Sequence, residues 1–465
     1  MGYRVVDALV EREAALEAGP AWQGATRASL EALLREPPPL NAQPFESILH
    51  QLIDDVLPWR ARVDHPRFLA FVPGSPTWPG VLADFIASGF NVFQGSWIGG
   101  SGASEVEIIV LDWFKEWIGY PAEAAGLFLS GGSAANLTAL ACARLHRTGP
   151  HNPTSVIYTS VEAHSSTTRA ARILGFADNR VRRLPTNGQQ RIDPQKLATA
   201  IAEDRDAGLG PLAVIANAGA TSTGAIDPLD DIAAICAESG VWLHVDAAYG
   251  GFAVLTDRGR ASMRGIERAD SITLDPHKWL FQPFEAGCLL VRDGKRLDHA
   301  FQTSAGYLQD AKIEEAPLHE RPVNFMDRGI QLTRSARALK VWTSLKYYGI
   351  GPFRDAIDLA LDLAVHAQKR IEGSPVLELL TPATLGIVCF RRVTGPAGER
   401  LAEDRTIEDW NARIVRALAD DGTALMSSTR VNGTYALRIC ILSHRTRQAD
   451  VDRVIDWIEN AAPEL

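Results

Sequence analysis

Short apolar runs alternate with helical patterns along the middle of the chain, and this alternation limits the possible folds more than any other feature. The runs are rich in β-branched residues and short enough to be strands, and they cover 155–160, 212–217, 241–246, 271–275 and 287–292. The helical patterns between them include 134–147, 194–204 and 229–239. Strands that are apolar on both faces are typical of a parallel sheet covered by helices on both sides. The sequence therefore predicts an α/β fold with a mostly parallel central sheet.

The N-terminal part of the chain is predicted to be helical. Helical periodicity runs through 3–19 and 28–36, prolines interrupt it at 35–44, and another amphipathic pattern follows at 45–57. A segment of this size is too small to bury a core of its own. We therefore expect residues 1–60 to form a helical segment that packs on a partner subunit.

The C-terminal part is predicted to be a smaller α+β domain. A strand pattern at 385–392 is followed by a helical pattern at 405–420 and a second strand pattern at 436–442. We expect this domain to cover 346–465, which leaves 61–345 for the large domain.

The composition argues against nucleic-acid binding and against a membrane span. The 465 residues contain 47 Lys and Arg against 56 Asp and Glu, and this formal net charge of −9 is the opposite of the usual basic excess of nucleic-acid-binding proteins. No apolar run is long enough to cross a bilayer, and the first residues lack the apolar core of a secretory signal. We expect a cytoplasmic protein.

The cysteines argue against disulfides and against a metal site. They are odd in number, widely spaced and without a CxxC pair, so we expect small core residues in a reducing compartment. They are Cys142, Cys236, Cys288, Cys389 and Cys440.

Ligands of parallel sheets collect where the strands end, so the residues that follow each run are the first candidates for chemistry. In "SITLDPHKWLFQP" (271–283) an apolar run stops at Asp275, and Lys278 then stands beside Trp279. Lys278 has ordinary interpretations, as an exposed lysine or as the partner of a carboxylate. The sharper hypothesis is a desolvated amine that forms a Schiff base.

A possible anion site follows an earlier run. The segment "LFLSGGSAANLTALACARL" (127–145) predicts a strand, a Gly-Gly-Ser turn and a helix. The backbone N–H groups and the dipole of a helix start suit a phosphate, and Ser133 offers a hydroxyl. The same pattern also serves as an ordinary helix cap, and the Gly-Lys-Ser/Thr of a Walker loop is missing.

Two further candidates follow strand patterns. Asp246 ends the run in "VWLHVDAAYGG" (241–251), where a buried carboxylate is costly unless donors or a cation meet it. It is either a structural cap or the partner of a cationic ligand nitrogen. His164, in "EAHSSTTRAARILG" (162–175), taken alone is an ordinary structural histidine.

Together these residues match the needs of pyridoxal 5′-phosphate (PLP). Its aldehyde bonds to a lysine, its phosphate binds a helix start, and its ring nitrogen stays protonated against a carboxylate, which makes the ring an electron sink for carbanion chemistry.

At these residues the chain resembles the PLP-dependent group II amino acid decarboxylases, the family of aromatic L-amino acid decarboxylase. The resemblance extends over nearly the whole length, and its markers are "HPRFLAFVPG" (65–74), "LADF" (82–85), "SEVE" (104–107), "LDWF" (111–114), "SGGSAAN" (130–136), "AHSS" (163–166), "HVDAAYGG" (244–251), "DPHKW" (275–279) and "RSARALKVW" (334–342). It implies PLP-dependent transferase fold type I, with a seven-stranded sheet in the large domain. It also implies decarboxylation of an L-amino acid by a homodimer with active sites at the subunit interface.

The resemblance also implies roles for individual residues. Lys278 matches the lysine that holds the cofactor, Asp246 the partner of its ring nitrogen, and His164 the histidine stacked on its ring. Ala248 matches the small residue beneath the ring. The positions that match the family's phosphate site are Ser133, Ala134, Ala135 and His277.

Tyr307 matches the tyrosine of the family's catalytic loop, within "FQTSAGYLQDAK" (301–312). A phenol brought in by a closing loop supplies the proton that replaces the lost carboxylate and excludes water. Relatives with phenylalanine at this position, or without the stacking histidine, form aldehydes by oxidation. The presence of both Tyr307 and His164 favours simple decarboxylation, although without the resemblance Tyr307 is an ordinary loop aromatic.

The resemblance implies an aromatic substrate, although the substrate class and the reaction both stay open. The matching positions of the substrate pocket are Phe71, Pro73, Trp97, Ile98 and Thr333. Trp97 and Ile98 are expected to reach across the dimer, and Thr333 is expected to favour one ring over two. An acidic substrate would instead need a cation, for which Arg67 is the nearest candidate. The chain could also be an aromatic aldehyde synthase, or a protein that binds the cofactor without catalysis.

Three residues depart from the family pattern. Asp275 replaces a frequent asparagine, and we expect it either to weaken cofactor binding or to cap a neighbouring element. Gly74 and Ser75 replace a Thr-Ala type pair.

Overall fold

The computed structural model describes residues 1–149, 152–302, 322–395 and 398–461. This part of the chain forms two compact units. One unit is continuous, Gly74–Leu359, and the other joins Met1–Pro73 to Ala360–Leu465. The division into 1–60, 61–345 and 346–465 stays a prediction.

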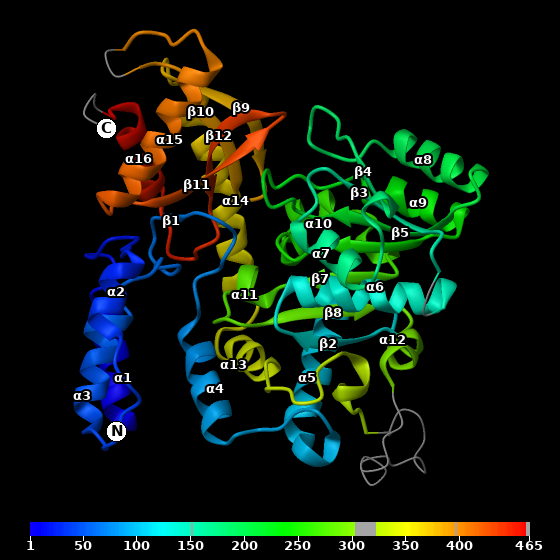
Figure 1. Cartoon of the computed structure of the whole chain (residues 1–465), viewed down its shortest axis with the longest axis horizontal. Helices are drawn as coiled ribbons and strands as arrows, with labels where there is room; N and C mark the ends of the chain where they lie inside the picture. Colours follow the sequence, from blue (N-terminus) through cyan, green and yellow to red (C-terminus); the bar gives the residue numbers. More distant parts are fainter. Residues whose placement is uncertain (150–151, 303–321, 396–397, 462–465) are drawn as a thin grey trace. The chain divides into compact units, whose positions relative to one another are not determined.

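The unit Gly74–Leu359 is built on a seven-stranded sheet (Figure 1). Its order is β2-β8-β7-β6-β5-β3-β4, and β8 runs antiparallel to both of its neighbours while the other pairs are parallel. The strands are β2 (Ala125–Leu129), β3 (Ser155–Ser160), β4 (Val181–Leu184), β5 (Gly210–Asn217), β6 (Trp242–Asp246), β7 (Ser271–Leu274) and β8 (Gly287–Val291). The α/β prediction is confirmed, because all five apolar runs form strands of this sheet.

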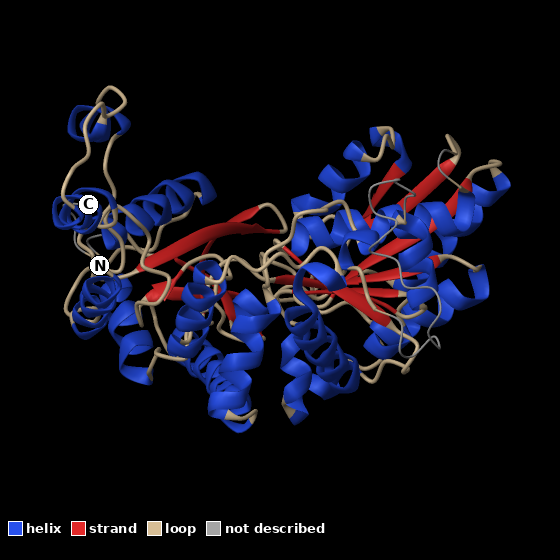
Figure 2. Ribbon diagram, turned by 90° about the horizontal axis from the view of Figure 1, so that it is seen from below, coloured by secondary structure: helices blue, strands red, loops and turns tan. Residues whose placement is uncertain are grey.

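Helices cover both faces of this sheet (Figure 2), as its doubly apolar strands require. The α-helices are α4 (Trp78–Gly89), α5 (Trp97–Ile118), α6 (Gly132–Thr148), α7 (Ser165–Ile173), α8 (Pro194–Asp206), α9 (Leu229–Ser239), α10 (Asp257–Ser262), α11 (Pro276–Trp279), α12 (Gly294–Phe301) and α13 (Ala338–Tyr348). The predicted helices 134–147, 194–204 and 229–239 correspond to α6, α8 and α9. The shorter 3₁₀ turns are η2 (Asp178–Arg180), η3 (Gly251–Leu255), η4 (Ile266–Arg268) and η6 (Phe325–Arg328).

The register of β6 and β7 aligns polar side chains on the sheet. His244 lies opposite Ser271, and Asp246 lies opposite Thr273. Because side chains alternate between the two faces of a strand, all four share one face. Helix α6 packs against both strands, so its side chains can meet this polar row.

The segment before α4 lies directly against α11. The backbone N–H of Gly74 donates to the carbonyl of His277 at 3.1 Å, and that of Thr77 donates to the carbonyl of Phe281 at 2.7 Å. A Cβ atom at position 74 would lie 1.9 Å from the Lys278 carbonyl oxygen. The departure at Gly74 therefore has a physical reason, because only glycine allows this approach.

A buried ion pair holds α5 to the segment that precedes α13. Arg334 donates to Glu107 at 2.7 Å, and both side chains are almost fully buried. Glu107 also accepts from the amide of Gln94 at 2.6 Å and from the Phe128 N–H at 2.7 Å, so its charge is countered and hydrogen-bonded. Since Phe128 belongs to β2, the pair fixes the strand that leads into α6.

The second unit is an α+β structure around a five-stranded sheet of order β1-β11-β12-β10-β9. The two-residue strand β1 pairs in parallel with β11, which explains why the N-terminal part of the chain belongs to this unit. The strands are β1 (Phe68–Leu69), β9 (Leu377–Thr384), β10 (Ile387–Arg392), β11 (Leu425–Val431) and β12 (Thr434–Cys440). The helices are α1 (Gly2–Ala14), α2 (Arg27–Leu34), α3 (Phe45–Gln51), the π-helix η1 (Leu52–Val56), α15 (Asp404–Asp420) and α16 (Gln448–Glu459), while α14 (Gly351–Glu372) crosses the boundary between the units.

The predicted flanking elements are confirmed, and the N-terminal helices end earlier than predicted. The N-terminal helix stops at Ala14, before Gly19 and Pro20, and the helix predicted over 45–57 changes to π geometry at Leu52. Neither α1, α2, α3 nor η1 contains a buried residue.

All five cysteines are buried and unpaired, as expected for core residues. In the described ranges, no helix combines the length and apolar character that crossing a membrane requires. No cluster of three or more His, Cys, Asp or Glu among those same residues is arranged to hold a metal ion.

Candidate active site

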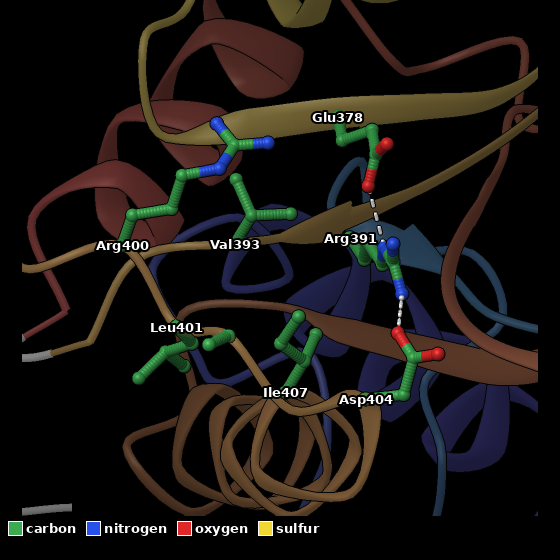
Figure 3. A pocket seen from close by; sticks show the side chains of 8 residues that line it. Glu378, Arg391, Val393, Arg400, Leu401, Asp404 and Ile407 are labelled. Carbon is green, nitrogen blue, oxygen red and sulfur yellow. Dashed lines mark hydrogen bonds and ion pairs between the residues drawn. The ribbon is translucent and has the colours of Figure 1, made fainter.

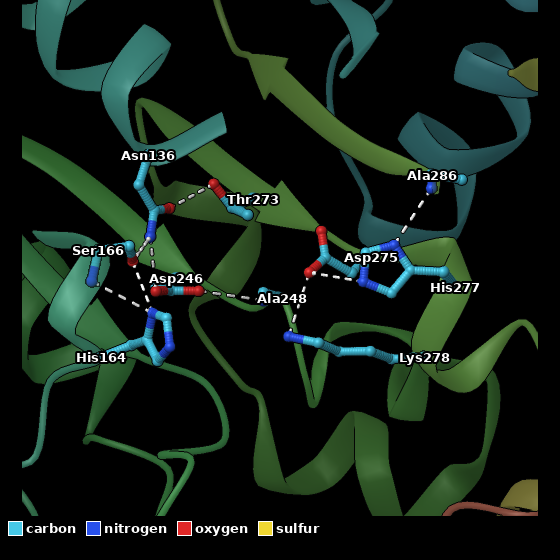
Figure 4. A network of polar contacts seen from close by, with 10 residues as sticks. All are labelled: Asn136, His164, Ser166, Asp246, Ala248, Thr273, Asp275, His277, Lys278 and Ala286. Atoms are coloured by element: carbon cyan, nitrogen blue, oxygen red, sulfur yellow. Dashed lines mark hydrogen bonds and ion pairs between the residues drawn. The ribbon is translucent and has the colours of Figure 1, made fainter. Parts of the chain in front are cut away.

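Asp246 is the buried centre of a polar cluster at the carboxyl ends of β6 and β7 (Figure 4). Its Oδ2 accepts a hydrogen bond from the Asn136 side chain at 2.8 Å, and its Oδ1 accepts one from the Ala248 N–H at 3.2 Å. Both oxygen atoms therefore accept a hydrogen bond from the protein, which offsets the cost of burying a carboxylate.

Asn136, in the second turn of α6, connects this carboxylate to its neighbours. Its Nδ2 donates to Asp246 and, at 2.9 Å, to the Ser166 hydroxyl. Its Oδ1 accepts from the Thr273 hydroxyl at 2.7 Å and contacts His244 Nε2 at 3.0 Å. The side chain is buried, and every hydrogen-bonding position of its amide is used.

His244 lies beneath Asn136 in the interior of β6 and is fully buried. Burial lowers the pKa of His244 to about 4, although the Asp246 carboxylate acts in the opposite direction. The imidazole is therefore neutral at physiological pH. Its Nδ1 contacts the Ser271 hydroxyl at 2.9 Å, and that hydroxyl also accepts from Trp242 Nε1 at 2.9 Å.

We expect His244 to make the protein less stable as the pH falls from about 6.5 towards 4. Its pKa lies below the ordinary value of 6.5, so the unfolded chain binds a proton that the folded chain excludes. At about 1.4 kcal/mol per pKa unit, His244 alone removes about 3 kcal/mol from the free energy of unfolding over that window. Urea unfolding of the native and His244→Asn chains across this range measures the effect.

The slope of stability against pH should be shallower for the His244→Asn variant. His65 and His444, whose pKa values burial also lowers to about 4, contribute equally in both chains. Parallel slopes for the two chains would show that His244 does not cause the acid sensitivity.

His164 caps the start of α7, just beyond the end of β3, and is exposed to solvent. Its Nδ1 contacts the Ser166 hydroxyl at 2.8 Å and accepts from the Ser166 backbone N–H at 3.3 Å. Partial burial of the ring lowers the pKa of His164, and the Asp246 carboxylate opposes this shift. Through Ser166 and Asn136, His164 thus belongs to the same network as Asp246.

Lys278 lies in the short helix α11, on the other side of Asp246 from His164 in Figure 4. Its Nζ forms an ion pair with Asp275 Oδ2 at 3.1 Å. The same oxygen lies 3.5 Å from His277 Nε2, and burial lowers the pKa of His277. The Nδ1 of His277 accepts from the Ala286 N–H at 3.2 Å, which orients its ring. Asp275 does not cap α11 by a side-chain hydrogen bond, so its role here is to balance Lys278.

The start of α6 provides backbone donors beside these side chains. Gly131 has φ of 153°, and a Cβ on Gly132 would lie 2.9 Å from the Ala248 Cβ and 3.1 Å from Asp275 Oδ2. The N–H groups of Gly132 and Ser133 precede the first acceptors within the helix. Those of Ala134 and Ala135 instead donate to the Gly131 carbonyl at 3.0 and 3.1 Å. Of the predicted phosphate residues in this turn, Ser133 therefore offers an N–H group, whereas the N–H groups of Ala134 and Ala135 are engaged within the helix. Gly132, which was not predicted, offers a second N–H group, and the phosphate roles stay predictions.

These residues fit PLP. A glycine-lined helix start suits its phosphate, the buried Asp246 suits a protonated ring nitrogen, and the Lys278 amine suits its aldehyde. Each requirement is met by a different element, so the fit depends on the fold.

The predicted substrate residues are divided between the two units. Trp97 begins α5 and is half-buried, while Ile98 and Thr333 are exposed. Phe71 and Pro73 belong to the other unit. Tyr307 lies outside the described residues. The roles of all six stay predictions.

A separate pocket of about 410 Å³ lies in the α+β unit (Figure 3). Its two carboxylates, Glu378 and Asp404, both pair with Arg391, at 2.6 and 2.9 Å. Because their charges are already countered, this pocket offers no acid or base comparable to those around Asp246.

Sequence reasoning missed Asn136, Ser166, Thr273 and His244. The sequence does mark these residues, because each is a polar residue inside an otherwise apolar strand or near the start of a helix. However, the pattern alone did not show that α6 and α7 bring them to one point.

The sequence and the fold of this chain are similar to those of known enzymes. The model of the pyridoxal-dependent decarboxylase conserved domain matches residues 28–393. The chain is 40% identical over its whole length to an aromatic-L-amino-acid decarboxylase of Bacillus atrophaeus, covering 95% of that protein. It is 31% identical to a phenylacetaldehyde synthase of Petunia hybrida, over 99% of the chain and 93% of that protein. A crystal structure of TDC from Oryza sativa with PLP and tryptamine superposes with a TM-score of 0.91 at 29% identity, covering 98% of the chain and 96% of that structure.

Proposed function

The chain belongs to the pyridoxal-dependent decarboxylase family, and on that premise we propose that it converts an aromatic L-amino acid to the corresponding amine and CO₂. It is a PLP-dependent amino acid decarboxylase of fold type I. The proposal concerns its substrate, its product and the roles of its residues.

The observation that carries the proposal is the meeting of Asp246, Lys278 and His164 beside the start of α6. When bound, PLP supplies an electron sink that stabilises the carbanion left by loss of CO₂. Lys278 would hold the aldehyde, and Asp246 would hold the proton on the ring nitrogen. Gly132 and Ser133 would bind the phosphate, with His277 beside them.

The surrounding residues keep these groups in place. His164 would cover one face of the ring and Ala248 the other, where a larger side chain would leave no room. Tyr307 would deliver a proton to the carbon that loses CO₂. Asp275 balances the Lys278 ammonium and orients it from one side.

Arg67, the candidate cation for binding an acidic substrate, is already engaged by other groups. The Nε of Arg67 donates to the Thr423 carbonyl at 2.7 Å, and its Nη1 forms an ion pair with Asp450 at 3.5 Å. Both partners lie in the same unit as Arg67. The guanidinium is thus engaged within that unit, which favours the aromatic substrate.

A product assay tests the proposal. The purified protein with PLP is incubated separately with phenylalanine, tyrosine, dihydroxyphenylalanine, tryptophan, glutamate and aspartate, and amines, aldehydes and peroxide are quantified. An aromatic amine without peroxide is the expected result. Amine from glutamate or aspartate alone would contradict the proposed substrate class.

The second candidate function is oxidative formation of an aldehyde, which the likeness to a phenylacetaldehyde synthase makes specific. We expect Tyr307→Phe to lose amine formation because phenylalanine has no proton to deliver. With dissolved O₂ as the oxidant and water supplying the carbonyl oxygen, the variant should instead release aldehyde, CO₂, ammonia and peroxide. Exposed Tyr347→Phe is the matched control and should keep the amine product. An unchanged product from Tyr307→Phe would remove this residue from the mechanism.

We further propose a homodimer in the cytoplasm. In the unit Gly74–Leu359, Phe90 is 81% exposed and Ile98 is 77% exposed, and these apolar surfaces suit a subunit interface. The N-terminal helices, which bury no residue within one chain, suit the same purpose. Five unpaired cysteines suit a reducing compartment. Light scattering of the purified protein measures the assembly.

A further inference from the structure

The amide of Asn136 has a fixed orientation. An ionised carboxylate only accepts hydrogen bonds, so the group facing Asp246 Oδ2 at 2.8 Å must be the Nδ2 donor. Turning the amide over would place its oxygen against that carboxylate and its NH₂ group against the Thr273 hydroxyl. With all four contacts made, the observed orientation is the one that satisfies every partner.

This orientation sets the direction of the hydrogen bonds beneath it. Because Asn136 Oδ1 can only accept, His244 Nε2 carries a proton and donates it. The neutral ring must then accept at Nδ1 from the Ser271 hydroxyl, which itself accepts from Trp242 Nε1–H. The hydrogen bonds therefore form a chain with one direction: each group donates to the next, from Trp242 in the interior of the sheet to Asp246 at its edge.

The same amide acts together with the backbone N–H of Ser166 on the state of His164. The Ser166 hydroxyl oxygen accepts from Asn136 Nδ2, so its hydrogen is free to point at His164 Nδ1, 2.8 Å away. The Ser166 backbone N–H faces the same nitrogen at 3.3 Å. With two hydrogens directed at it, Nδ1 is an acceptor, and the neutral ring carries its proton on Nε2.

We propose that Asn136 is a positioning residue that couples Asp246 to His164, holding a donor against the carboxylate and the imidazole in its Nε2–H form. The role in holding PLP rests on the proposed function, whereas the coupling itself does not. The Asn136 side chain thereby orients both Asp246, the proposed partner of the ring nitrogen, and His164, the residue proposed to cover the ring. Asn136 acts through these two residues and is not itself a reacting group.

Nuclear magnetic resonance of the cofactor-free protein tests the coupling directly. Selective ¹⁵N labelling of histidine distinguishes Nε2–H from Nδ1–H rings, and the His164→Gln chain identifies the signal of His164. The charges of Asp246, Lys278, Asp275 and Arg169 act on the pKa of this ring, so spectra are recorded at one pH well above that pKa. We expect His164 to be an Nε2–H ring. A predominant Nδ1–H ring in the native protein would overturn the proposal without any variant.

The Asn136→Asp substitution replaces the NH₂ donor of this side chain by an oxygen atom and keeps the shape of the side chain. A carboxylate would then face Asp246, and two carboxylates at that distance must share a proton. Ser166 would turn its hydrogen towards the new acceptor and leave His164 Nδ1. The Ser166 backbone N–H still faces that nitrogen, so we expect only part of the His164 signal to shift to the Nδ1–H form. We expect PLP affinity, measured by equilibrium dialysis, to fall about tenfold or more.

The matched control is Gln94→Glu, which makes the same change beside another buried carboxylate. Gln94 Nε2 donates to Glu107 Oε2 at 2.6 Å, and neither residue has a hydrogen bond with His164 or Asp246. This control should leave the His164 signal and the PLP affinity unchanged. Equal effects of the two substitutions, or none from Asn136→Asp, would overturn the proposal. Because the tautomer is read without PLP or substrate, failure of the proposed function would leave this result intact.

Discussion

Replacing Lys278 with arginine is expected to reduce decarboxylation by about 10⁴-fold or more, the scale of losing a covalent catalytic group. Arginine keeps a positive charge for Asp275, which lies 3.1 Å from the lysine amine. It cannot, however, lose a proton to bond with an aldehyde. The loss would therefore report the missing covalent bond and not an unpaired buried carboxylate.

Borohydride reduction followed by peptide mass spectrometry gives the decisive measurement. The native protein should carry the mass of reduced PLP on the peptide that contains Lys278, and the variant should not. Exposed Lys346→Arg is the matched control and should keep both label and activity. Label on another lysine of the native protein would contradict the assignment.

Lys340 is the strongest rival for this role. Burial lowers the pKa of Lys340, a property often linked to reactive lysines. Its amine, however, pairs with Asp84 at 2.7 Å and donates to the Pro283 and Glu285 carbonyls. An amine enclosed by three oxygen atoms is a structural cation, so geometry favours Lys278 where the pKa alone would favour Lys340.

Much of the large sheet could be predicted because strands buried on both faces leave a continuous apolar run. The run at 155–160 coincides with β3, and the helical pattern at 229–239 coincides with α9. Strand β4 was missed because it contains Arg182 and Arg183, as an edge strand can. Strand β9 was missed because several of its side chains are only half-buried.

The candidate site was predictable where a polar residue ends an apolar run. Asp246 and Lys278 stand out for this reason, whereas His164 needed the family resemblance to be singled out. Asn136 lies 110 residues from Asp246 along the chain, and no local pattern could pair them. Their contact arises only when α6 packs across β6 and β7.

Replacing Asp246 with asparagine is expected to lower kcat by about 10³-fold and to weaken PLP binding by about tenfold or more. The amide has no charge to hold a proton on the ring nitrogen. It also brings its NH₂ group against one of two donors, Asn136 Nδ2 at 2.8 Å or the Ala248 N–H at 3.2 Å. The expected loss thus combines missing charge with a local conflict between donors.

Asp227→Asn separates these two contributions. Asp227 is buried like Asp246, and it too accepts at both oxygen atoms, from the Ile192 N–H at 2.7 Å and the Asn217 N–H at 2.7 Å. Its substitution creates the same conflict between donors without removing a proposed cofactor contact. We expect Asp227→Asn to lower the unfolding temperature while folded protein keeps its kcat and its PLP affinity. If both variants lost kcat equally, the charge of Asp246 would have no special place in catalysis, and its burial at the end of β6 would be purely structural.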